Sequence, residues 1–515
     1  MSGSHLNRSW EISSVPEGST ASGGAGKGDR NPAVDAGEKS DAPVVPKKPP
    51  NKAQAAEGVE GRGAAKGNAG EATAHRTPSR ESASKGLERV RETAKRDRRL
   101  KFTALLHHIT PSLLVESFYD LNRTAAVGVD GVTWQDYEDI LYERAPELHR
   151  EIHTGAYRAQ ASRRTYIAKA DGKLRPLGIA AVEDKIVQQA VVKVLSAIYE
   201  EDFLGFSYGY RPGRGQHDAL DAVWMGIETR QIGWILDADI SAFFDTIDHD
   251  WMLEFLQHRI ADKRVLRLIK KWLKAGIIED GRRIAAERGT PQGAVISPLL
   301  ANIYLHYAFD TWAQHWRKHH ARGDVILVRY ADDSVLGFQH EEEAKQFLAA
   351  MRERLAKFGL ALHPQKTRLI EFGPHAERRR KERGLGRPET FDFLGFTHCC
   401  AKTLKGKFKI LRLTVKKRMR ATLAAIREKL KRRRHEPIGQ VGAWLKRTMR
   451  GYFNYHAVPD NLKRLRGFRY EVSRAWFAAL NRRSQKSKMT WARFGLLAGK
   501  YLPLPRRVHP YPSQR

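Results

Sequence analysis

The sequence contains very little cysteine. Cys399 and Cys400 are the only two among 515 residues, and they are neighbours in the chain. Consecutive Cα atoms lie about 3.8 Å apart, which is shorter than the usual span of a disulfide. Two ligands also cannot complete a tetrahedral zinc site. Disulfide scaffolds and cysteine-based zinc sites are therefore excluded.

Long apolar runs are also lacking. Because no stretch of about 18 uninterrupted apolar residues occurs, we expect no membrane-spanning helix. The N-terminal residues are not followed by the apolar segment of a secretory signal peptide. We therefore expect a cytoplasmic protein that has no membrane partner.

Acidic residues are scarce in the last part of the chain. Residues 401–515 contain 32 Lys or Arg and four acidic residues, so +28 of the net charge of +33 lies there. Aromatic residues such as Trp444 and Phe468 are interleaved with the basic ones. Such a surface binds polyanions because binding releases their counterions. A solvated basic helical face is the alternative, but it leaves the scarcity of acids unexplained, so the segment favours nucleic acid.

The length corresponds to about three domains of roughly 150 residues each. The first residues are rich in Gly, Ala, Ser and Pro with Trp10 as the only aromatic, which predicts a disordered tail. Short β-rich runs then alternate with amphipathic helices, which predicts an α+β domain with an antiparallel sheet, and the pattern becomes helical after Val415. The divisions we expect are 1–85 (tail), 86–160 (N-terminal extension), 161–413 (α+β domain), 414–484 (helical domain) and 485–515 (basic C-terminal segment).

The periodicity of apolar residues predicts individual elements. The expected strands are 234–240, 325–330, 334–338, 391–397 and 408–415. The expected helices are 86–99, 102–121, 183–198, 251–256, 341–357, 416–434, 439–455 and 461–482. Residues 375–388 are expected to form a basic loop, and the proline-rich stretch 502–512 neither a helix nor a strand.

Three acidic residues stand where apolar strands are expected to end. Asp239 closes the run from Trp234, and Asp332 and Asp333 occupy the turn of an apolar hairpin. Like charges in such a setting cost several kcal/mol unless a cation offsets them. A pair of divalent ions held by these carboxylates would offset the charge and activate an in-line phosphoryl displacement. When the hairpin is considered alone, an ordinary Asp-Asp turn explains it equally well.

Three short segments follow one another in an order that is typical of a known family. Gly289-Thr-Pro-Gln-Gly lies between Asp239 and Tyr330-Ala-Asp-Asp. This order resembles the palm of reverse transcriptases, in which Phe391-Asp-Phe-Leu-Gly-Phe matches the primer-grip hairpin. The resemblance implies a right-hand polymerase, with fingers and palm followed by a helical thumb.

The resemblance also assigns the metal site. It implies that Asp239, Asp332 and Asp333 are catalytic and hold two Mg²⁺ ions, for which Mn²⁺ is a possible substitute. The backbone carbonyl of Ile240 is implied as an extra ligand, and Asp333 as either a weaker ligand or an outer contact. Asp245, Asp248 and Asp250 are better explained by helix capping than by metal binding.

Nucleotide-binding roles are implied for Arg175, Phe244, Gln292, Gly293 and Lys366. Arg175, in Gly172-Lys-Leu-Arg, matches a fingers residue that clamps phosphate oxygens. Phe244 matches a gate whose ring clashes with a 2′-hydroxyl, which selects deoxynucleotides, whereas Phe243 is expected in the core. Lys366 matches a proton donor or a charge stabiliser for pyrophosphate; a solvated lysine is the alternative. His363 replaces an Asn that is common in this part of the family.

More narrowly, the chain resembles bacterial group II intron-encoded reverse transcriptases, or maturases, over about 90–515. Asn122-Arg-Thr-Ala-Ala-Val-Gly resembles their N-terminal extension, and Arg450-Gly-Tyr-Phe-Asn-Tyr resembles their thumb region. The resemblance implies contacts with nucleic acid for Arg450, Tyr452, Arg482, Arg483, Lys486, Arg506 and Arg507. The sequence shows no Cys- and His-bearing nuclease module, so we expect the short form that does not cleave DNA by itself.

The implied function is RNA-directed DNA synthesis combined with binding of the parent intron RNA to assist splicing and mobility. Its partners would be structured intron RNA and RNA template, DNA primer or target, and dNTPs, in a bacterial cytoplasm and at the nucleoid when on DNA. One alternative is a domesticated reverse transcriptase in phage defence or CRISPR spacer acquisition. Another is a non-catalytic RNA-binding splicing cofactor, although intact clustered acids would then carry only a repulsive cost. The sequence does not identify the parent intron, the DNA target or the oligomeric state.

Overall fold

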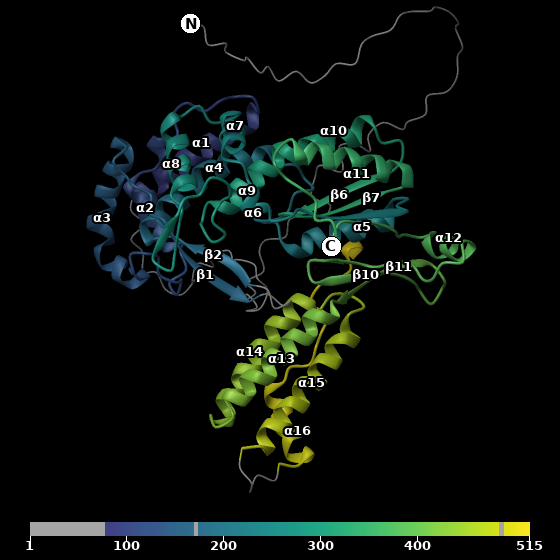
Figure 1. Ribbon diagram of the computed structural model, residues 1–515. Coiled ribbons are helices and arrows are strands. Elements are labelled where there is room, and N and C mark those ends of the chain that lie inside the picture. The colour runs from purple at the N-terminus through teal and green to yellow at the C-terminus, as the bar shows by residue number, and fades with distance from the viewer. Residues whose placement is uncertain (1–77, 169–173, 484–488, 515) are drawn as a thin grey trace, which may run out of the picture.

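The computed structural model describes residues 78–168, 174–483 and 489–514 (Figure 1). Most of the predicted tail, residues 1–77, lies outside the described part. The prediction is wrong for residues 78–85, because helix α1 (Pro78–Arg96) already begins at Pro78. Proline is favoured at the first helical position, where its missing N–H leaves no bond unmade.

A helical layer follows α1. The predicted helix 102–121 is wrong as a single element: it is split into a short 3-10 turn, η2 (Leu106–His108), and helix α2 (Pro111–Tyr119). Thr110 caps α2 by accepting a hydrogen bond from the Leu113 N–H, and Pro111 starts it. Helix α3 (Trp134–Thr154) begins with a capping box and ends at a left-handed Gly155. Helices α1 and α2 pack against the long helix α4 (Val182–Asp202).

The palm sheet has four antiparallel strands in the order β6-β7-β3-β8. Their bounds are β3 (Trp234–Asp239), β6 (Val325–Tyr330), β7 (Asp333–Phe338) and β8 (Arg368–Glu371). The first three confirm the predicted strands to within one residue at each end. Side chains alternate across the sheet: Leu236 and Leu336 enter one hydrophobic core, and Ile235 and Val335 enter another. Both faces of the sheet are therefore buried.

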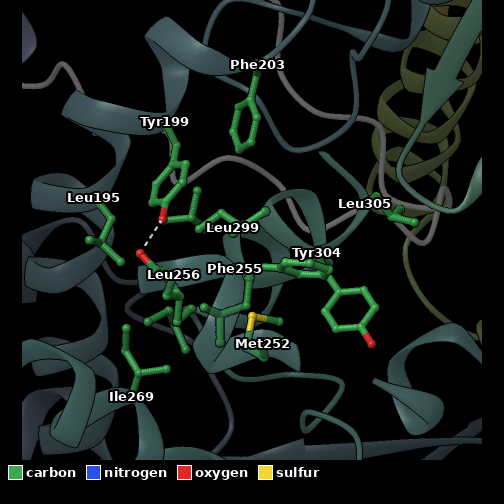
Figure 2. Close-up of a cluster of buried hydrophobic side chains, with 14 of the residues drawn as sticks. Leu195, Tyr199, Phe203, Met252, Phe255, Leu256, Ile269, Leu299, Tyr304 and Leu305 are labelled. Carbon is green, nitrogen blue, oxygen red and sulfur yellow. Dashed lines mark hydrogen bonds between the residues drawn. The ribbon is translucent and has the colours of Figure 1, made fainter. Parts of the chain in front are cut away.

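Helices cover the two faces of this sheet. Helices α10 (Thr311–His319) and α11 (Glu341–Ala356) lie over one face, and α5 (Gln216–Thr229) lies over the other (Figure 1). The larger core continues away from the sheet among α4, α7 (His249–Gln257), α8 (Lys263–Lys274) and α9 (Ser297–Leu305). Figure 2 shows this cluster, in which the Tyr199 hydroxyl donates a hydrogen bond of 3.3 Å to the Leu256 carbonyl. This packing fixes α9 beside the palm.

A second sheet forms the fingers side. It has the order β2-β1-β4-β5, with the bounds β1 (Ser162–Ala168), β2 (Leu174–Ile179), β4 (Ile277–Glu279) and β5 (Arg282–Ile284). The hairpin of β1 and β2 is antiparallel, whereas β1 pairs with β4 in parallel. The chain returns from β5 toward the palm through the segment that precedes α9.

A third sheet, in the order β11-β10-β9, joins the palm to the helices that follow. Its strands are β9 (Phe391–Phe393), β10 (Phe396–Lys402) and β11 (Phe408–Thr414). The run 391–397 is not the single strand that periodicity predicted, because Leu394 and Gly395, both at positive φ, make a turn between two strands. The antiparallel pairing of β9 with β10 confirms the hairpin that the resemblance implied for this segment. The predicted loop 375–388 is also wrong in part, because it contains helix α12 (Ala376–Glu382).

The C-terminal helices form a bundle with a core of its own. They are α13 (Lys416–Arg432), α14 (Ile438–His456), α15 (Leu462–Asn481) and α16 (Trp491–Tyr501). The first three confirm the predicted helices, whereas α16 was missed. Phe468 and Trp476 are buried in this core, so much of the aromatic content interleaved with the basic residues serves packing. Among the described residues, no helix is long and apolar enough to span a bilayer. Apart from the end of the tail, the domain limits given above stay a prediction.

Candidate functional site

The strand ends that carry the predicted catalytic acids meet. In the antiparallel pairing of β3 with β7, Asp239 lies directly opposite Asp333. Tyr330 pairs with Asp333 across the β6–β7 hairpin, so Ala331 and Asp332 form its turn. Opposed residues in an antiparallel pair have Cα atoms about 4.5–5.5 Å apart. Two stretches of chain almost a hundred residues apart thus place three carboxylates at one edge of the palm sheet.

The turn that carries Asp332 has an unusual backbone. Ala331 has a φ of 58°, in the left-handed region that non-glycine residues rarely adopt. Gly209 lies against it, and a Cβ on Gly209 would be 2.3 Å from the Ala331 nitrogen. Only glycine allows the segment around Tyr208 to run this close beside the turn. Nearby, the Tyr208 N–H donates to the Arg329 carbonyl at 2.9 Å.

Charge is concentrated at this edge. Protein atoms crowd the carboxylates and reduce their hydration, although the outer side of Asp333 stays accessible to solvent. This loss of hydration, together with the negative charges of Asp332 and Asp239, raises the pKa of Asp333 to about 7. Loss of hydration and the charge of Asp239 also raise the pKa of Asp332. The carboxylates therefore disfavour full ionisation unless a cation is present.

Lys366 supplies one such cation. Its Nζ lies 2.7 Å from Asp239 Oδ2. Partial burial alone would lower the pKa of Lys366, but the hydrogen bond and charge of Asp239 outweigh that effect and raise it. The loop that carries Lys366 is tied to the end of β3, because the His363 N–H donates to the Asp239 carbonyl at 2.7 Å. His363 Nδ1 also accepts the Gln365 N–H at 3.3 Å, so its ring helps to hold the loop.

The carboxylates suit divalent cations, which prefer hard oxygen ligands. No group of three or more Asp, Glu, His or Cys side chains within 78–168, 174–483 and 489–514 is close enough to hold one ion by itself. An ion with octahedral preferences is commonly held by one or two carboxylates together with substrate phosphates, so a partial protein shell fits it. Ile240, buried directly after Asp239, remains a predicted backbone ligand.

Two predicted nucleotide-binding segments contact each other across the fingers and palm. The Arg175 Nε donates to Gln292 Oε1 at 3.1 Å, which joins β2 to the segment before α9. The Gly178 N–H donates to the Gln292 carbonyl at 2.7 Å. Gly293 has a φ of 130°, and a Cβ there would be 2.3 Å from the Gly178 carbonyl oxygen. The need for glycine at 293 follows from this close approach.

Phe244 lies on the short helix α6 (Phe243–Thr246), which begins after a left-handed Ala242 with a φ of 45°. Its side chain is 8% exposed, whereas that of Phe243 is 2% exposed, so Phe243 is a core residue as predicted. The Phe244 carbonyl accepts the Thr290 N–H at 2.8 Å, which ties α6 to the Gln292 segment. The gating role of Phe244 stays a prediction.

The capping interpretation holds for one of the three acids near Trp251. Asp248 Oδ1 accepts the N–H groups of Asp250 and Trp251, each at 3.0 Å, and so caps α7. Asp248 therefore has a structural role at the start of the helix.

The predicted nucleic-acid contacts of the thumb fall into two groups. Arg450 and Arg482 are exposed and available to phosphates. Arg483 instead donates to the Glu436 carbonyl at 3.0 Å, and the ring of Tyr452 stacks on Phe468 at a centroid distance of 3.9 Å. Tyr452 and Arg483 thus already have partners inside the bundle.

The segment after α16 returns to the palm. Its Val508 and His509 N–H groups donate to the Ala457 carbonyl at 3.0 and 3.2 Å. The Tyr511 ring then packs near Trp224 of α5, with a centroid distance of 6.5 Å. Arg506 and Arg507 are exposed on this segment, and Lys486 lies outside the described residues.

Sequence reasoning missed several residues of the site. Asp237 precedes Asp239 by two positions, which on a strand places both on one face, and its charge helps to raise the pKa of Asp333. That spacing could have found it. Arg329, next to Tyr330, is 1% exposed and forms an ion pair with the fully buried Asp310. No local pattern indicates that pairing, because its acid comes from a distant helix.

Comparisons with known proteins agree with this geometry. Residues 167–398 match the family model described as reverse transcriptase (RNA-dependent DNA polymerase). The chain is 39% identical over 240 residues to Protein YkfC of Escherichia coli strain K12, which covers 41% of this chain and 62% of that protein. It is 35% identical over 225 residues to the group II intron-encoded protein LtrA of Lactococcus lactis subsp. cremoris, which covers 43% of this chain and 37% of LtrA.

A third relative carries the word maturase in its name. Nuclear intron maturase 1, a mitochondrial protein of Arabidopsis thaliana, is 27% identical over 111 residues, which covers 22% of this chain and 15% of that protein. The chain thus spans between 15% and 62% of the length of these three curated relatives. Reverse transcriptases generally use divalent metal ions, and the three carboxylates fit such ions.

Proposed function

We propose that this chain, which is similar to a group II intron-encoded protein and matches the reverse transcriptase family model over residues 167–398, is an RNA-directed DNA polymerase. It adds dNTPs to a primer 3′-hydroxyl, and it also binds its parent intron RNA to assist splicing and mobility. The observation that carries the proposal is the pairing of Asp239 with Asp333, which brings both acidic segments to one edge of the sheet.

We assign the metal site to two Mg²⁺ ions, with Mn²⁺ as a substitute. When bound, the ions lower the pKa of the primer hydroxyl and neutralise the leaving pyrophosphate. Asp239 and Asp332 would hold them, and Asp333 would act as a weaker ligand or an outer contact that adds negative charge. The raised pKa of Asp333 supports this assignment, since a cation relieves the repulsion that raises it.

The chain's own cations would act on the triphosphate. Arg175 has a planar fork that suits phosphate oxygens, and its contact with Gln292 at 3.1 Å places it beside the segment that precedes α9. Lys366 lies against Asp239, so it is in reach of any phosphate that the metal ions hold. A protonated lysine there can donate a proton to pyrophosphate or stabilise its charge.

The thumb and the segment after it would bind RNA. Exposed cations such as Arg450, Arg482 and Arg506 would neutralise phosphates, which is the sequence-independent part of nucleic-acid affinity. Partners would be intron RNA, an RNA template, and a DNA primer or target, in the cytoplasm of a bacterium.

Primer extension tests the polymerase proposal directly. Purified full-length protein is given an RNA template, a DNA primer, dNTPs and Mg²⁺, and wild type is compared with Asp332→Ala. We expect loss of at least about three orders of magnitude in rate, in line with removal of a group that acts on the reacting atoms. Asp139→Ala, which changes an exposed acid on α3, is the matched control and should extend the primer as wild type does.

Equal product from wild type and Asp332→Ala would refute the active-site assignment. If wild type binds intron RNA but makes no DNA, a non-catalytic RNA-binding cofactor would be the function instead.

A further inference from the structure

A buried ion pair lies directly beneath the catalytic turn. The Arg329 guanidinium donates to both carboxylate oxygens of Asp310, at 2.7 Å from Nε and 2.5 Å from Nη2. The side chains are 1% and 0% exposed. A pair this deep in an apolar core is costly to form, so it needs a reason beyond stability.

The remaining donors of Arg329 reach the turn and its neighbour. Nη1 donates to the Ala331 carbonyl at 2.9 Å and to Asn302 Oδ1 at 3.1 Å, and Nη2 donates to Ser207 Oγ at 2.7 Å. Asn302 Nδ2 in turn donates to the Gly209 carbonyl at 2.7 Å. The Arg329 guanidinium therefore binds the left-handed Ala331 directly. Through Asn302 it also fixes Gly209, which lies against Ala331.

The helix that supplies Asp310 is itself irregular. A π-helical turn, η3 (His306–Asp310), interrupts the run of helix between α9 and α10. Such turns are rare and are often found at functional sites. Asn302 on α9 and Asp310 at the end of the π-helical turn both reach the same guanidinium.

We propose that Arg329 and Asp310 are positioning residues, which hold the Ala331 turn in its left-handed conformation and thereby aim the Asp332 and Asp333 carboxylates at the catalytic metal ions. The inference rests on the proposed polymerase function for the identity of the metal site. A non-glycine residue keeps a φ of 58° only where its surroundings determine it, and here the determining contact is the Arg329 bond to the Ala331 carbonyl.

The test uses a double variant that removes the pair without leaving a lone charge. Arg329→Met with Asp310→Leu replaces the ion pair by apolar side chains, which often preserves folding. Mn²⁺ binding to the full-length chain, free of nucleic acid, is followed by electron paramagnetic resonance, and thermal unfolding is followed in parallel. We expect binding about 10-fold to 100-fold weaker than wild type, the usual effect of losing a partner that orients metal ligands.

A matched pair elsewhere provides the control. Arg412 and Asp221 form a buried ion pair between β11 and α5, with side chains 2% and 1% exposed. Arg412→Met with Asp221→Leu should change unfolding to a similar degree and leave Mn²⁺ affinity unchanged. Arg329→Lys keeps the charge but not the fork, so it should give only partial rescue of Mn²⁺ binding.

Wild-type Mn²⁺ affinity in a folded Arg329→Met, Asp310→Leu variant would overturn the inference. Should that variant not fold, Gly209→Ala answers the question, because it leaves the ion pair intact and pushes a methyl group against the turn. Unchanged Mn²⁺ binding in a folded Gly209→Ala protein would also overturn it. Failure of the polymerase proposal has a different signature: wild type would bind Mn²⁺ and yet extend no primer.

Discussion

Single residues decide how much negative charge the site holds before a metal ion arrives. The acids that supply this charge were predictable, because Asp239, Asp332 and Asp333 stand at the ends of strongly apolar strands. The cation that balances these acids was harder to predict. The resemblance assigned Lys366 to the site, but the ion pair of Lys366 with Asp239 forms only because the loop that carries Lys366 folds back onto β3. The ion pair of Arg329 with Asp310 could not be predicted from the sequence. The two residues meet only after strand β6 and the helix that carries Asp310 have packed against each other.

The first residue-scale prediction concerns the pH dependence of stability without metal. Asp333 has a pKa of about 7 in the folded protein against 3.8 in the unfolded chain. Between these values the unfolded chain has released its proton while the folded one retains it, so ionisation destabilises the folded state as pH rises through this window. Asp333→Asn removes the effect. We expect the variant to match wild type near about pH 4 and to be more stable near about pH 8.

Denaturant unfolding in the presence of EDTA measures this difference, with Asp139→Asn as the control acid. An Asp333→Asn protein that gains no stability over wild type at the higher pH would contradict the shift. Saturating Mg²⁺ should shrink the gain, because the cation takes over the role of the proton.

The second residue-scale prediction concerns the choice of sugar. Phe244→Ala should admit ribonucleotides, raising the ratio of rNTP to dNTP incorporation by about 10-fold or more, since the ring would otherwise meet the 2′-hydroxyl. Single-nucleotide extension with dATP and ATP measures it. Phe243→Leu, a core change next to it, should leave sugar choice unchanged. Unaltered discrimination in Phe244→Ala would remove the gate assignment.

Elements of secondary structure were predictable where periodicity was strong. The β6–β7 hairpin and helices α13 to α15 follow their apolar patterns closely. The failures have local causes. Proline at 111 divided an apparently continuous helix, and the Leu394–Gly395 turn divided an apparently continuous strand. Pairing between β2 and the Gln292 segment could not be foreseen, because contacts across sheets leave no periodic signal.

That pairing gives the prediction at the scale of elements. Gly293→Ala forces a Cβ to within 2.3 Å of the Gly178 carbonyl oxygen and strains a backbone at a φ of 130°. Overpacking of this kind costs about 1–3 kcal/mol of folding stability. Where the strain is relieved by moving the Gln292 segment, we expect kcat/KM for dNTPs to fall by about one to two orders of magnitude. We expect most of this loss to appear as a higher KM for dNTPs, because the substitution displaces Gln292 and Arg175 together.

Gly467→Ala is the matched glycine change, on α15 with no atom within 4 Å of the added Cβ. It should leave nucleotide kinetics unchanged and stabilise the helix by about 0.5–1 kcal/mol. Steady-state primer extension at varied dNTP concentration compares the two. Wild-type KM in Gly293→Ala would contradict the fingers–palm contact as a determinant of nucleotide binding.

Positive charge is concentrated in the last part of the whole molecule, and this uneven distribution was evident from the sequence. The sequence showed only in part which of the interleaved residues would be exposed. Aromatic side chains in the basic segment, such as Phe468 and Trp476, build the core of the helical bundle, so the exposed cations carry the affinity for phosphate. Helix α16 went unrecognised, although Thr490 caps its start by accepting the Arg493 N–H and is a signal that could have found it.

The prediction at this scale is a salt dependence. Affinity for intron RNA should fall steeply as salt rises, and Arg450→Ala should reduce the slope of log K against log salt by about 1. Arg433→Ala is the control, because Arg433 is already paired with Glu436 at 2.6 Å. Filter binding over a range of salt concentrations measures both. Equal slopes for wild type and Arg450→Ala would remove Arg450 from the RNA interface.

The returning segment after α16 has a mechanical consequence. The bundle continues from β11, and Val508 and His509 bind Ala457 at the end of α14 while Tyr511 packs near Trp224 of α5. Tyr455 of α14 makes a further attachment, because its ring lies 5.1 Å from that of His217 on α5. Any rotation of the bundle relative to the palm would therefore disturb several attachments at once, and releasing Tyr511 alone would leave the others in place.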